Sequence, residues 1–276
     1  MAVQVVSDLH LESPKAYDVF ELEPKAPYLA LLGDIGNVAA HKDDCLAFLT
    51  RQLRQFRAVL FVPGNHEAYH STWPATLEIL AAFEREAGDD PSLGTFVLLD
   101  RATFRLPDCC SSSSSSSGAM VIAGCSLFSA VPDDRQMAVS MGLNDFYMTG
   151  SDWDVAAHNA AHRRDLSWLN ARVAELEQQP DVGAIVILSH WSPSMDARAA
   201  DPRHAASPIT SGFATDLSTE PCFKSSKVKV WAFGHTHYNC DFLVERGLGP
   251  LRLVTNQRGY YFDQARGFDG QKTIEL

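Results

Sequence analysis

Five short motifs rich in metal-binding residue types are spread along the chain. They are Asp8-Leu9-His10, Gly33-Asp34, Gly64-Asn65-His66-Glu67, Ser189-His190 and Gly234-His235-Thr236-His237. Their side chains offer carboxylate oxygens, an amide oxygen and imidazole nitrogens, a donor set that suits Mn²⁺, Fe²⁺/Fe³⁺, Zn²⁺ or Mg²⁺. Because there are more donors than one ion needs, we expect two divalent ions about 3.5–4 Å apart.

Each motif follows a short apolar run of the kind that forms a buried strand. The runs are Val3–Val6, Tyr28–Leu32, Ala58–Val62, Ala184–Leu188 and Val228–Phe233. Continuous stretches of Val, Ile and Leu predict strands that are covered on both faces. Since ligands bind outside the carboxyl ends of parallel strands, we expect the five motifs to converge at one edge of the sheet.

Helical patterns lie between the predicted strands. Residues 42–56, 75–87 and 160–178 each place a stripe of side chains at helical spacing. The three stripes are Cys45, Phe48, Leu49, Leu53 and Phe56; Leu77, Leu80, Ala81 and Glu84; and Leu166, Leu169, Val173 and Leu176. This alternation of strand and helix predicts an α/β layered domain. The end of the chain differs, because residues 241–245 and 251–255 flank a Gly/Pro turn and predict a β-hairpin.

Two segments interrupt the alternation. Residues 107–118 contain seven consecutive serines and predict a flexible insertion between strands at 104–106 and 120–125. Residues 129–158 lack clear periodicity but are rich in aromatic side chains, which predicts a cap or long loop within the domain. The length of 276 residues fits a single domain, 1–276, with these two additions.

The composition excludes several classes of protein. A hydrophobic share of 46% and a charged share of 21% are ordinary for a globular protein and exclude global disorder. The net charge of −11 argues against a protein that holds long nucleic acid on a basic face. No run approaches the roughly 20 apolar residues of a membrane helix. The N-terminus shows no signal pattern, so we expect a cytoplasmic or nuclear protein.

The cysteines indicate neither a metal site nor a disulfide framework. Six cysteines are scattered without a CxxC pair, and we expect them to be reduced thiols. The oligomeric state is not indicated by any pattern.

Taken in this order, the five motifs resemble those of the calcineurin-like metallophosphoesterases. The resemblance extends over nearly the whole chain and omits only the serine-rich insertion and parts of 129–158. It implies a four-layer α/β/β/α sandwich that carries a dinuclear metal centre.

The resemblance also implies a role for each motif residue. The ions would be held by two groups of side chains that share a bridging Asp34: Asp8, His10 and His237 for one ion, and Asn65, His190 and His235 for the other. His66 would be the catalytic histidine near the leaving group without binding a metal.

Two further residues are candidates for substrate contacts. Asn144 lies in the predicted cap. Arg258 could contact phosphate, because the guanidinium fork matches phosphate oxygens, or it could brace the loop that holds His237.

Departures from the motifs of other branches narrow the resemblance. Protein Ser/Thr phosphatases of this superfamily carry an Arg soon after the bridging Asp, and purple acid phosphatases carry a ligand Tyr there. Residues 35–39 contain neither. The run Leu188–Ser194, with Trp191 in place of a second His, and the run Thr255–Tyr260 are similar to the small-molecule phosphoesterase branch.

These observations lead to a hypothesis about function. We expect a metal-dependent phosphoric ester hydrolase in which a hydroxide that bridges two ions attacks a small phosphodiester or phosphomonoester, cyclic nucleotides included. His66 would protonate the departing alkoxide. A protein Ser/Thr phosphatase is one alternative, disfavoured by the missing Arg. A non-catalytic scaffold of the same fold is another, disfavoured because every ligand position is filled.

Overall fold

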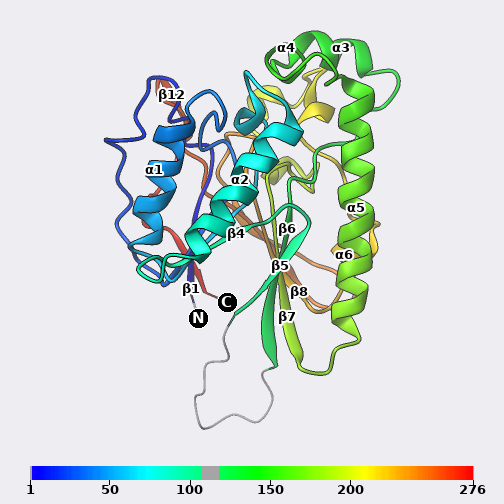
Figure 1. The fold of residues 1–276 in the computed structure, drawn as a ribbon. Helices are drawn as coiled ribbons and strands as arrows, with labels where there is room; N and C mark the ends of the chain where they lie inside the picture. The colour runs from blue at the N-terminus through cyan, green and yellow to red at the C-terminus, as the bar shows by residue number, and fades with distance from the viewer. Residues whose placement is uncertain (1, 107–117, 276) are drawn as a thin grey trace.

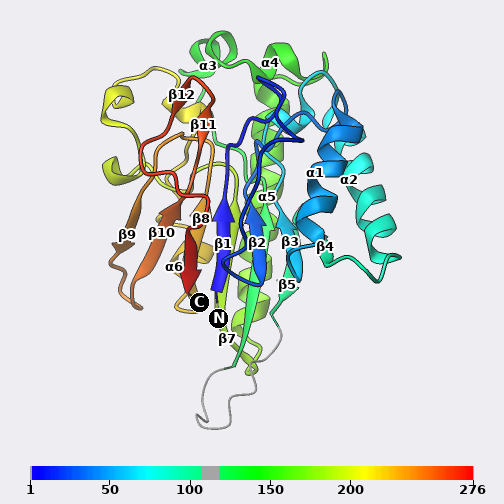
Figure 2. The same ribbon diagram turned by 90° about the vertical axis from the view of Figure 1, so that its left-hand side faces the viewer.

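Two β-sheets packed face to face form the centre of the computed structural model, which describes residues 2–106 and 118–275 (Figures 1 and 2). The first sheet has the order β13-β1-β2-β3-β4. Its strands are β1 (Ala2–Val6), β2 (Tyr28–Leu31), β3 (Ala58–Phe61), β4 (Thr95–Leu98) and β13 (Thr273–Glu275). Strands β1 to β4 run parallel, and β13 pairs antiparallel with β1 at the edge.

The second sheet has the order β5-β6-β7-β8-β10-β9. Its strands are β5 (Ala102–Arg105), β6 (Ala119–Cys125), β7 (Val182–Ser189), β8 (Val228–Phe233), β9 (Asp241–Val244) and β10 (Leu251–Thr255). The four inner strands are parallel, and the two edge strands are antiparallel to their neighbours. A separate small hairpin is made by β11 (Gly259–Tyr260) and β12 (Asp263–Gln264).

Helices cover the outer face of each sheet (Figure 2). One hydrophobic cluster joins the first sheet to α1 (Lys42–Leu53) and α2 (Trp73–Gly88). Another joins the second sheet to α5 (Val155–Glu177) and α6 (Pro221–Lys224). A third lies between the two sheets. The predicted four-layer α/β/β/α sandwich is therefore confirmed.

Strand β2 shows why the central strands are apolar on both faces. Leu29 and Leu31 pack with the helices, whereas Tyr28 and Ala30 pack against the second sheet. Because alternate side chains of a strand point to opposite faces, a strand between two layers must be apolar throughout.

The helices agree with the predicted periodicity, with one shift of face. In α1 the predicted stripe is buried, while Phe56 lies beyond the helix end at Leu53. In α2 the buried face is Trp73, Thr76, Leu80, Phe83 and Ala87, so it contains only Leu80 of the predicted stripe. Predicted Glu84 instead accepts a hydrogen bond from the backbone N–H of Leu98.

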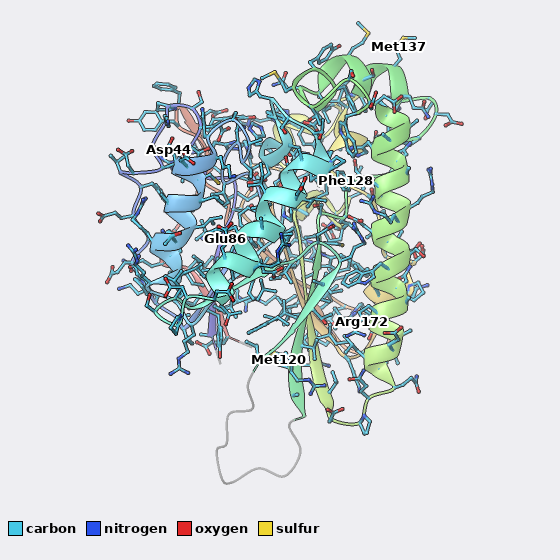
Figure 3. The ribbon with its side chains drawn as sticks, in the orientation of Figure 1. Asp44, Glu86, Met120, Phe128, Met137 and Arg172 are labelled. Carbon is cyan, nitrogen blue, oxygen red and sulfur yellow. The ribbon has the colours of Figure 1, made fainter. Side chains whose placement is uncertain are left out.

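Of the two segments that interrupt the predicted alternation, the structure describes the second in full and only Gly118 of the first. Residues 107–117 of the serine-rich segment lie outside the described residues, between the paired strands β5 and β6. Residues 129–158 contain α3 (Gln136–Gly142), α4 (Asp145–Met148) and the start of α5, and we call this segment the cap. Figure 3 shows Met137 at its outer tip, where the side chain is 78% exposed.

The β9–β10 hairpin is confirmed as an antiparallel pair, and β10 also joins β8 in parallel. The sequence reading did not identify β4, β13 or the β11–β12 hairpin. Among the helices in the described ranges, none has the length and apolar character needed to cross a membrane.

Candidate metal centre

All seven predicted metal ligands come together at the carboxyl ends of five parallel strands. Residues after β1, β2 and β3 come from the first sheet, and residues after β7 and β8 come from the second. Two clusters of side chains with close donor atoms share Asp34. We call Asp8, His10, Asp34 and His237 the first half, and Asp34, Asn65, His190 and His235 the second half.

The first half brings its imidazoles close to two carboxylates. His10 Nε2 lies 2.9 Å from His237 Nε2 and 3.9 Å from Asp34 Oδ2. His237 Nε2 is 3.3 Å from Asp8 Oδ1. Asp8 is also held in place, because it accepts hydrogen bonds from the backbone N–H of His235.

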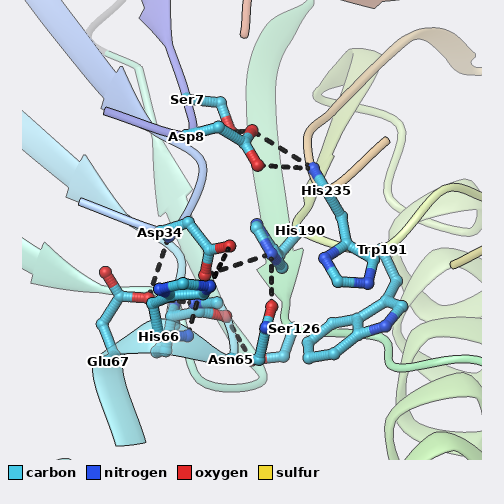
Figure 4. A network of polar contacts seen from close by, with 12 residues as sticks. Ser7, Asp8, Asp34, Asn65, His66, Glu67, Ser126, His190, Trp191 and His235 are labelled. Carbon is cyan, nitrogen blue, oxygen red and sulfur yellow. Dashed lines mark hydrogen bonds and ion pairs between the residues drawn. The ribbon is translucent and has the colours of Figure 1, made fainter. Parts of the chain in front are cut away.

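The second half is centred on His190, which Figure 4 shows between Asp34 and His235. His190 Nε2 is 3.4 Å from Asp34 Oδ1 and 3.1 Å from Asn65 Oδ1. Its Nδ1 lies 2.7 Å from the carbonyl oxygen of Leu32, which fixes Nε2 as the nitrogen that faces the site.

Asp34 directs one carboxylate oxygen to each half. Oδ1 faces His190, and Oδ2 faces His10. Burial opposes ionisation, but the imidazoles of His190 and His66 hold the pKa of Asp34 well below its usual range. An ionised carboxylate with an oxygen toward each half has the geometry of a bridging ligand.

The backbone is strained at most of the ligand positions. Asp8, His10, Asp34, His235 and His237 have φ values between 47° and 69°, in the left-handed region. Side chains other than glycine rarely adopt this conformation, and it persists only where surrounding structure enforces it. The concentration of such residues at one place marks a functional site.

Glycines and a buried acid shape the turns that carry the ligands. A Cβ on Gly33 would collide with His190 and with the backbone of Gly64. Glu67 accepts hydrogen bonds from the backbone N–H groups of Gly64, Asp34 and Ile35, at 2.6, 2.9 and 2.8 Å. Burial and the charge of Asp34 raise the pKa of Glu67 to about 7. Glu67 therefore holds together the turns that carry Asp34 and Asn65.

The unpaired atoms of the site fit a cation. His235 Nε2 is buried and has no hydrogen-bond partner in the part of the chain that the structure describes. His10 Nε2 and His237 Nε2 face each other, although each would carry a lone pair in its metal-binding form. Cations between these nitrogens and the adjacent carboxylates would satisfy both features.

His66 lies beside Asp34 but outside the two halves. Its Nε2 is 3.9 Å from Asp34 Oδ2 and 3.3 Å from the hydroxyl of Tyr260. Its Nδ1 is 2.7 Å from Glu12 Oε1. Burial alone would lower the pKa of His66, but the carboxylates of Asp34 and Glu12 raise it to about 9. His66 is thus poised to be protonated near neutral pH.

The cap contributes a buried carboxylate to the second half. Asp145 of α4 accepts hydrogen bonds from Asn65 Nδ2 at 2.9 Å and from the Tyr69 hydroxyl at 2.6 Å. With its Nδ2 engaged in this way, Asn65 turns its Oδ1 toward His190. The cap therefore sets the orientation of a predicted ligand.

Aromatic rings pack against the second half. Trp191 is fully buried, donates from Nε1 to the carbonyl oxygen of Gly212 and lies 4.7 Å from the His235 ring (Figure 4). The Phe213 ring stacks on the His235 ring, with a centroid distance of 4.9 Å. In place of a second histidine, Trp191 supplies packing.

The two predicted substrate contacts stay predictions. Asn144 is exposed at the start of α4. Arg258 donates to the carbonyl oxygen of Leu9 and lies over the rings of Phe20 and Tyr261, which braces the loop that carries Asp8 and His10.

Glu12, Tyr260 and the ligand-orienting role of Asp145 were missed by the sequence reading. Glu12 follows His10 by two residues, but no spacing rule marks its contact with His66. Tyr260 ends the run Thr255–Tyr260, and the similarity of this run to the small-molecule phosphoesterase branch was the one sequence feature that pointed to Tyr260. Its ring lies 4.2 Å from that of His10 and 4.8 Å from that of His237.

Similar proteins were found in sequence and in structure. An uncharacterized protein, L509, of Acanthamoeba polyphaga mimivirus is 24% identical over 277 residues, which covers 94% of this chain and 91% of that protein. The crystal structure of phosphopantetheinyl hydrolase (PptH) from Mycobacterium tuberculosis superposes with a TM-score of 0.65 at 18% identity. The superposition covers 94% of this chain and 89% of that one, and it shows a shared fold.

The family comparison covers the region that holds every predicted metal ligand. The sequence profile of the calcineurin-like phosphoesterases matches residues 1–239. The chain therefore belongs to the calcineurin-like phosphoesterase family and is a metal-dependent phosphoesterase.

Proposed function

We propose that this phosphoesterase uses two divalent ions to hydrolyse small phosphodiesters or phosphomonoesters. One ion would be held by the first half of the site and the other by the second half, with Asp34 common to both. The oxygen and nitrogen donors are compatible with Mn²⁺, Fe²⁺/Fe³⁺, Zn²⁺ or Mg²⁺.

The observation that carries the proposal is the division of the ligands around Asp34. Each of its carboxylate oxygens faces a different imidazole, at 3.4 Å for His190 and 3.9 Å for His10. A site built for one ion would leave one of these groups of donors without a purpose.

The chemistry then divides between the ions and the side chains. When bound, two dications acidify water and offset the negative charge of the phosphoryl group. His66 would donate a proton from Nε2 to the departing oxygen, a contribution of roughly 10²–10⁴-fold for a positioned general acid. Asp34 and Glu12 would keep that imidazole in place and protonated.

The size of the expected substrate follows from the charge of the chain. A net charge of −11 disfavours long polyanions, because these bind mainly through contacts between cationic side chains and phosphates. A small ester needs only the local positive charge of the ions.

A substrate panel tests the proposal. The panel would contain bis-p-nitrophenyl phosphate, p-nitrophenyl phosphate, 2′,3′- and 3′,5′-cyclic nucleotides, a phosphopantetheinyl ester and a phosphopeptide. Each would be assayed with Mn²⁺, Mg²⁺, Zn²⁺ or Fe²⁺. We expect turnover of a small ester with an added metal. Turnover of the phosphopeptide alone would overturn the substrate assignment and favour a protein phosphatase.

A further inference from the structure

Glu12 connects the predicted leaving-group histidine to a predicted metal ligand. Its Oε1 lies 2.7 Å from His66 Nδ1 and 3.3 Å from His10 Nδ1. The Glu12 side chain is 9% exposed, and its Oε2 is buried without a hydrogen-bond partner among the described residues. Among residues 2–106 and 118–275, this carboxylate forms ion pairs with the imidazoles of His10 and His66.

The contact with His10 selects which nitrogen of that ring faces the metal site. A neutral imidazole carries its proton on the nitrogen that donates to an acceptor, and the other nitrogen keeps its lone pair. Because His10 Nδ1 is next to Glu12, its Nε2 is left facing His237 and Asp34. A carboxylate that accepts from a ligand histidine in this way fixes both tautomer and ring orientation.

The contact with His66 does the same for the ring beside the reaction centre. Donation from Nδ1 to Glu12 directs His66 Nε2 toward Asp34 and the Tyr260 hydroxyl. The His10 and His66 rings meet edge to face, with centroids 4.4 Å apart at 71°. The two imidazoles are therefore oriented together by one carboxylate.

The nearby cation Lys15 does not compete with the two imidazoles for the Glu12 carboxylate. Glu12 is in a β-bridge with Lys15, but the Lys15 side chain pairs with Asp44 on α1. Without that diversion, a lysine three residues away could compete with the imidazoles for the carboxylate.

We infer that Glu12 is a positioning residue that orients His10 toward the metal site and His66 toward the leaving group. The inference rests on the proposed function, because it assigns His66 the role of proton donor. It adds a residue outside the predicted ligand set whose loss changes how the enzyme responds to the leaving group.

Leaving-group dependence separates this role from a merely structural one. An ester with an alkoxide leaving group needs protonation, whereas p-nitrophenolate departs without much help. In Glu12→Leu at saturating metal, we expect kcat to fall roughly 10²-fold on an alkyl phosphate ester. The fall on the matching p-nitrophenyl ester should be less than about tenfold, with KM little changed.

Other variants make the interpretation specific. Glu12→Gln keeps an acceptor oxygen in the same place, so it should restore kcat on the alkyl ester to within about tenfold of wild type. When His66→Gln is already present, Glu12→Leu should lower kcat on the alkyl ester by no more than it does on the p-nitrophenyl ester, because only its effect through His10 remains. Glu21→Leu, which replaces an exposed glutamate on the same long loop, is the matched control and should behave as wild type.

A second readout does not depend on activity. Proton–nitrogen NMR of the imidazoles in metal-free protein reports the tautomer of each ring. We expect Nδ1-protonated neutral His10 and a hydrogen-bonded Nδ1–H on His66 in wild type, and loss of both signatures in Glu12→Leu. If the leucine variant does not fold, Glu12→Asp, whose shorter side chain reaches less far, should show the same changes at smaller amplitude.

The outcomes distinguish this inference from the proposed function. Unchanged tautomers and an equal loss of kcat on both esters would overturn the role of Glu12, even with an active wild-type enzyme. Absence of metal-dependent hydrolysis by wild type would overturn the proposed function instead, while the NMR comparison would still test whether Glu12 orients the two rings.

Discussion

The two halves of the candidate metal centre share Asp34 and similar donors, but they lie in different surroundings. In the first half, the His237 side chain is 25% exposed and Tyr260 lies against the imidazoles. In the second half, the His190 side chain is fully buried, and Trp191 packs against it.

The difference shows that similar ligands are supported in two ways, by a connection to His66 in the first half and by packing in the second. The first half contains one partly exposed ligand, His237, and is joined to His66 through Glu12. The second half is held by packing and by Asp145 from the cap. Electrostatic interactions strengthen as water is excluded, so the second half should hold its ion more firmly.

Removal of the metals should have the largest effect. We expect chelation to abolish hydrolysis, because both halves are needed to offset the charge of the phosphoryl group. Metal analysis during dialysis against chelator should show two phases, with the ion of the first half, whose ligand His237 is partly exposed, lost before that of the second. Full activity after exhaustive chelation would contradict the metal mechanism, and a single phase of loss would contradict the comparison.

Substitution of the shared ligand should be the most damaging single change. In Asp34→Asn, we expect kcat/KM to fall by roughly 10³-fold or more, the scale at which loss of a preorganised charge acts. His237→Ala should remove only the ion of the first half. Metal content per chain, measured by mass spectrometry, would separate the two cases. Equal metal loss in the two variants would argue against a bridging Asp34.

Loss of the cap carboxylate should weaken the second half alone. In Asp145→Ala, Asn65 loses the partner that orients its amide, and metal affinity should fall about 10–100-fold, as for other residues that hold a ligand in place. Isothermal titration would measure it. Asn144→Ala, which changes the exposed neighbour, is the control for affinity and also tests the predicted substrate contact through KM. An Asp145→Ala variant with wild-type affinity at both sites would show that the cap does not support the centre.

His158 is buried behind the second half, with its ring centroid 5.7 Å from that of Trp191, and should make stability depend on pH. Burial and the nearby His162 lower the pKa of His158 to about 3, against an ordinary value of 6.5. As pH falls below 6.5, the unfolded chain binds a proton that the folded chain does not, so stability decreases down to pH 3. The slope from this residue is about 1.4 kcal/mol per pH unit.

The matched variant is His158→Gln in metal-free protein. It should lack this part of the slope, so its free energy of unfolding should approach that of wild type as pH falls from 6 to 4. Urea denaturation at each pH would measure this. Parallel pH profiles for the two proteins would show that His158 is not held neutral in the fold.

Much of the fold could be predicted from local patterns. The apolar runs identified the strands that carry the motifs, and helical spacing identified α1, α2 and α5. Strand β13 was missed because three residues at an edge have no distinctive pattern. The face of α2 was shifted because Thr76 is buried there, donating to the carbonyl oxygen of Glu67, and periodicity of apolar residues does not register a buried threonine.

The sequence by itself determined the metal-binding residue types, their order after the strands and the family. These features depend on residues close together in the chain, where turn chemistry and strand alternation act. The tertiary structure decided which side chains meet from segments that follow different strands: Glu12 with His66, Asp145 with Asn65 and Trp191 with His235. The paired residues are 54, 80 and 44 positions apart in the sequence, and their contacts depend on strand order within each sheet and on how the two sheets pack, which no local spacing encodes.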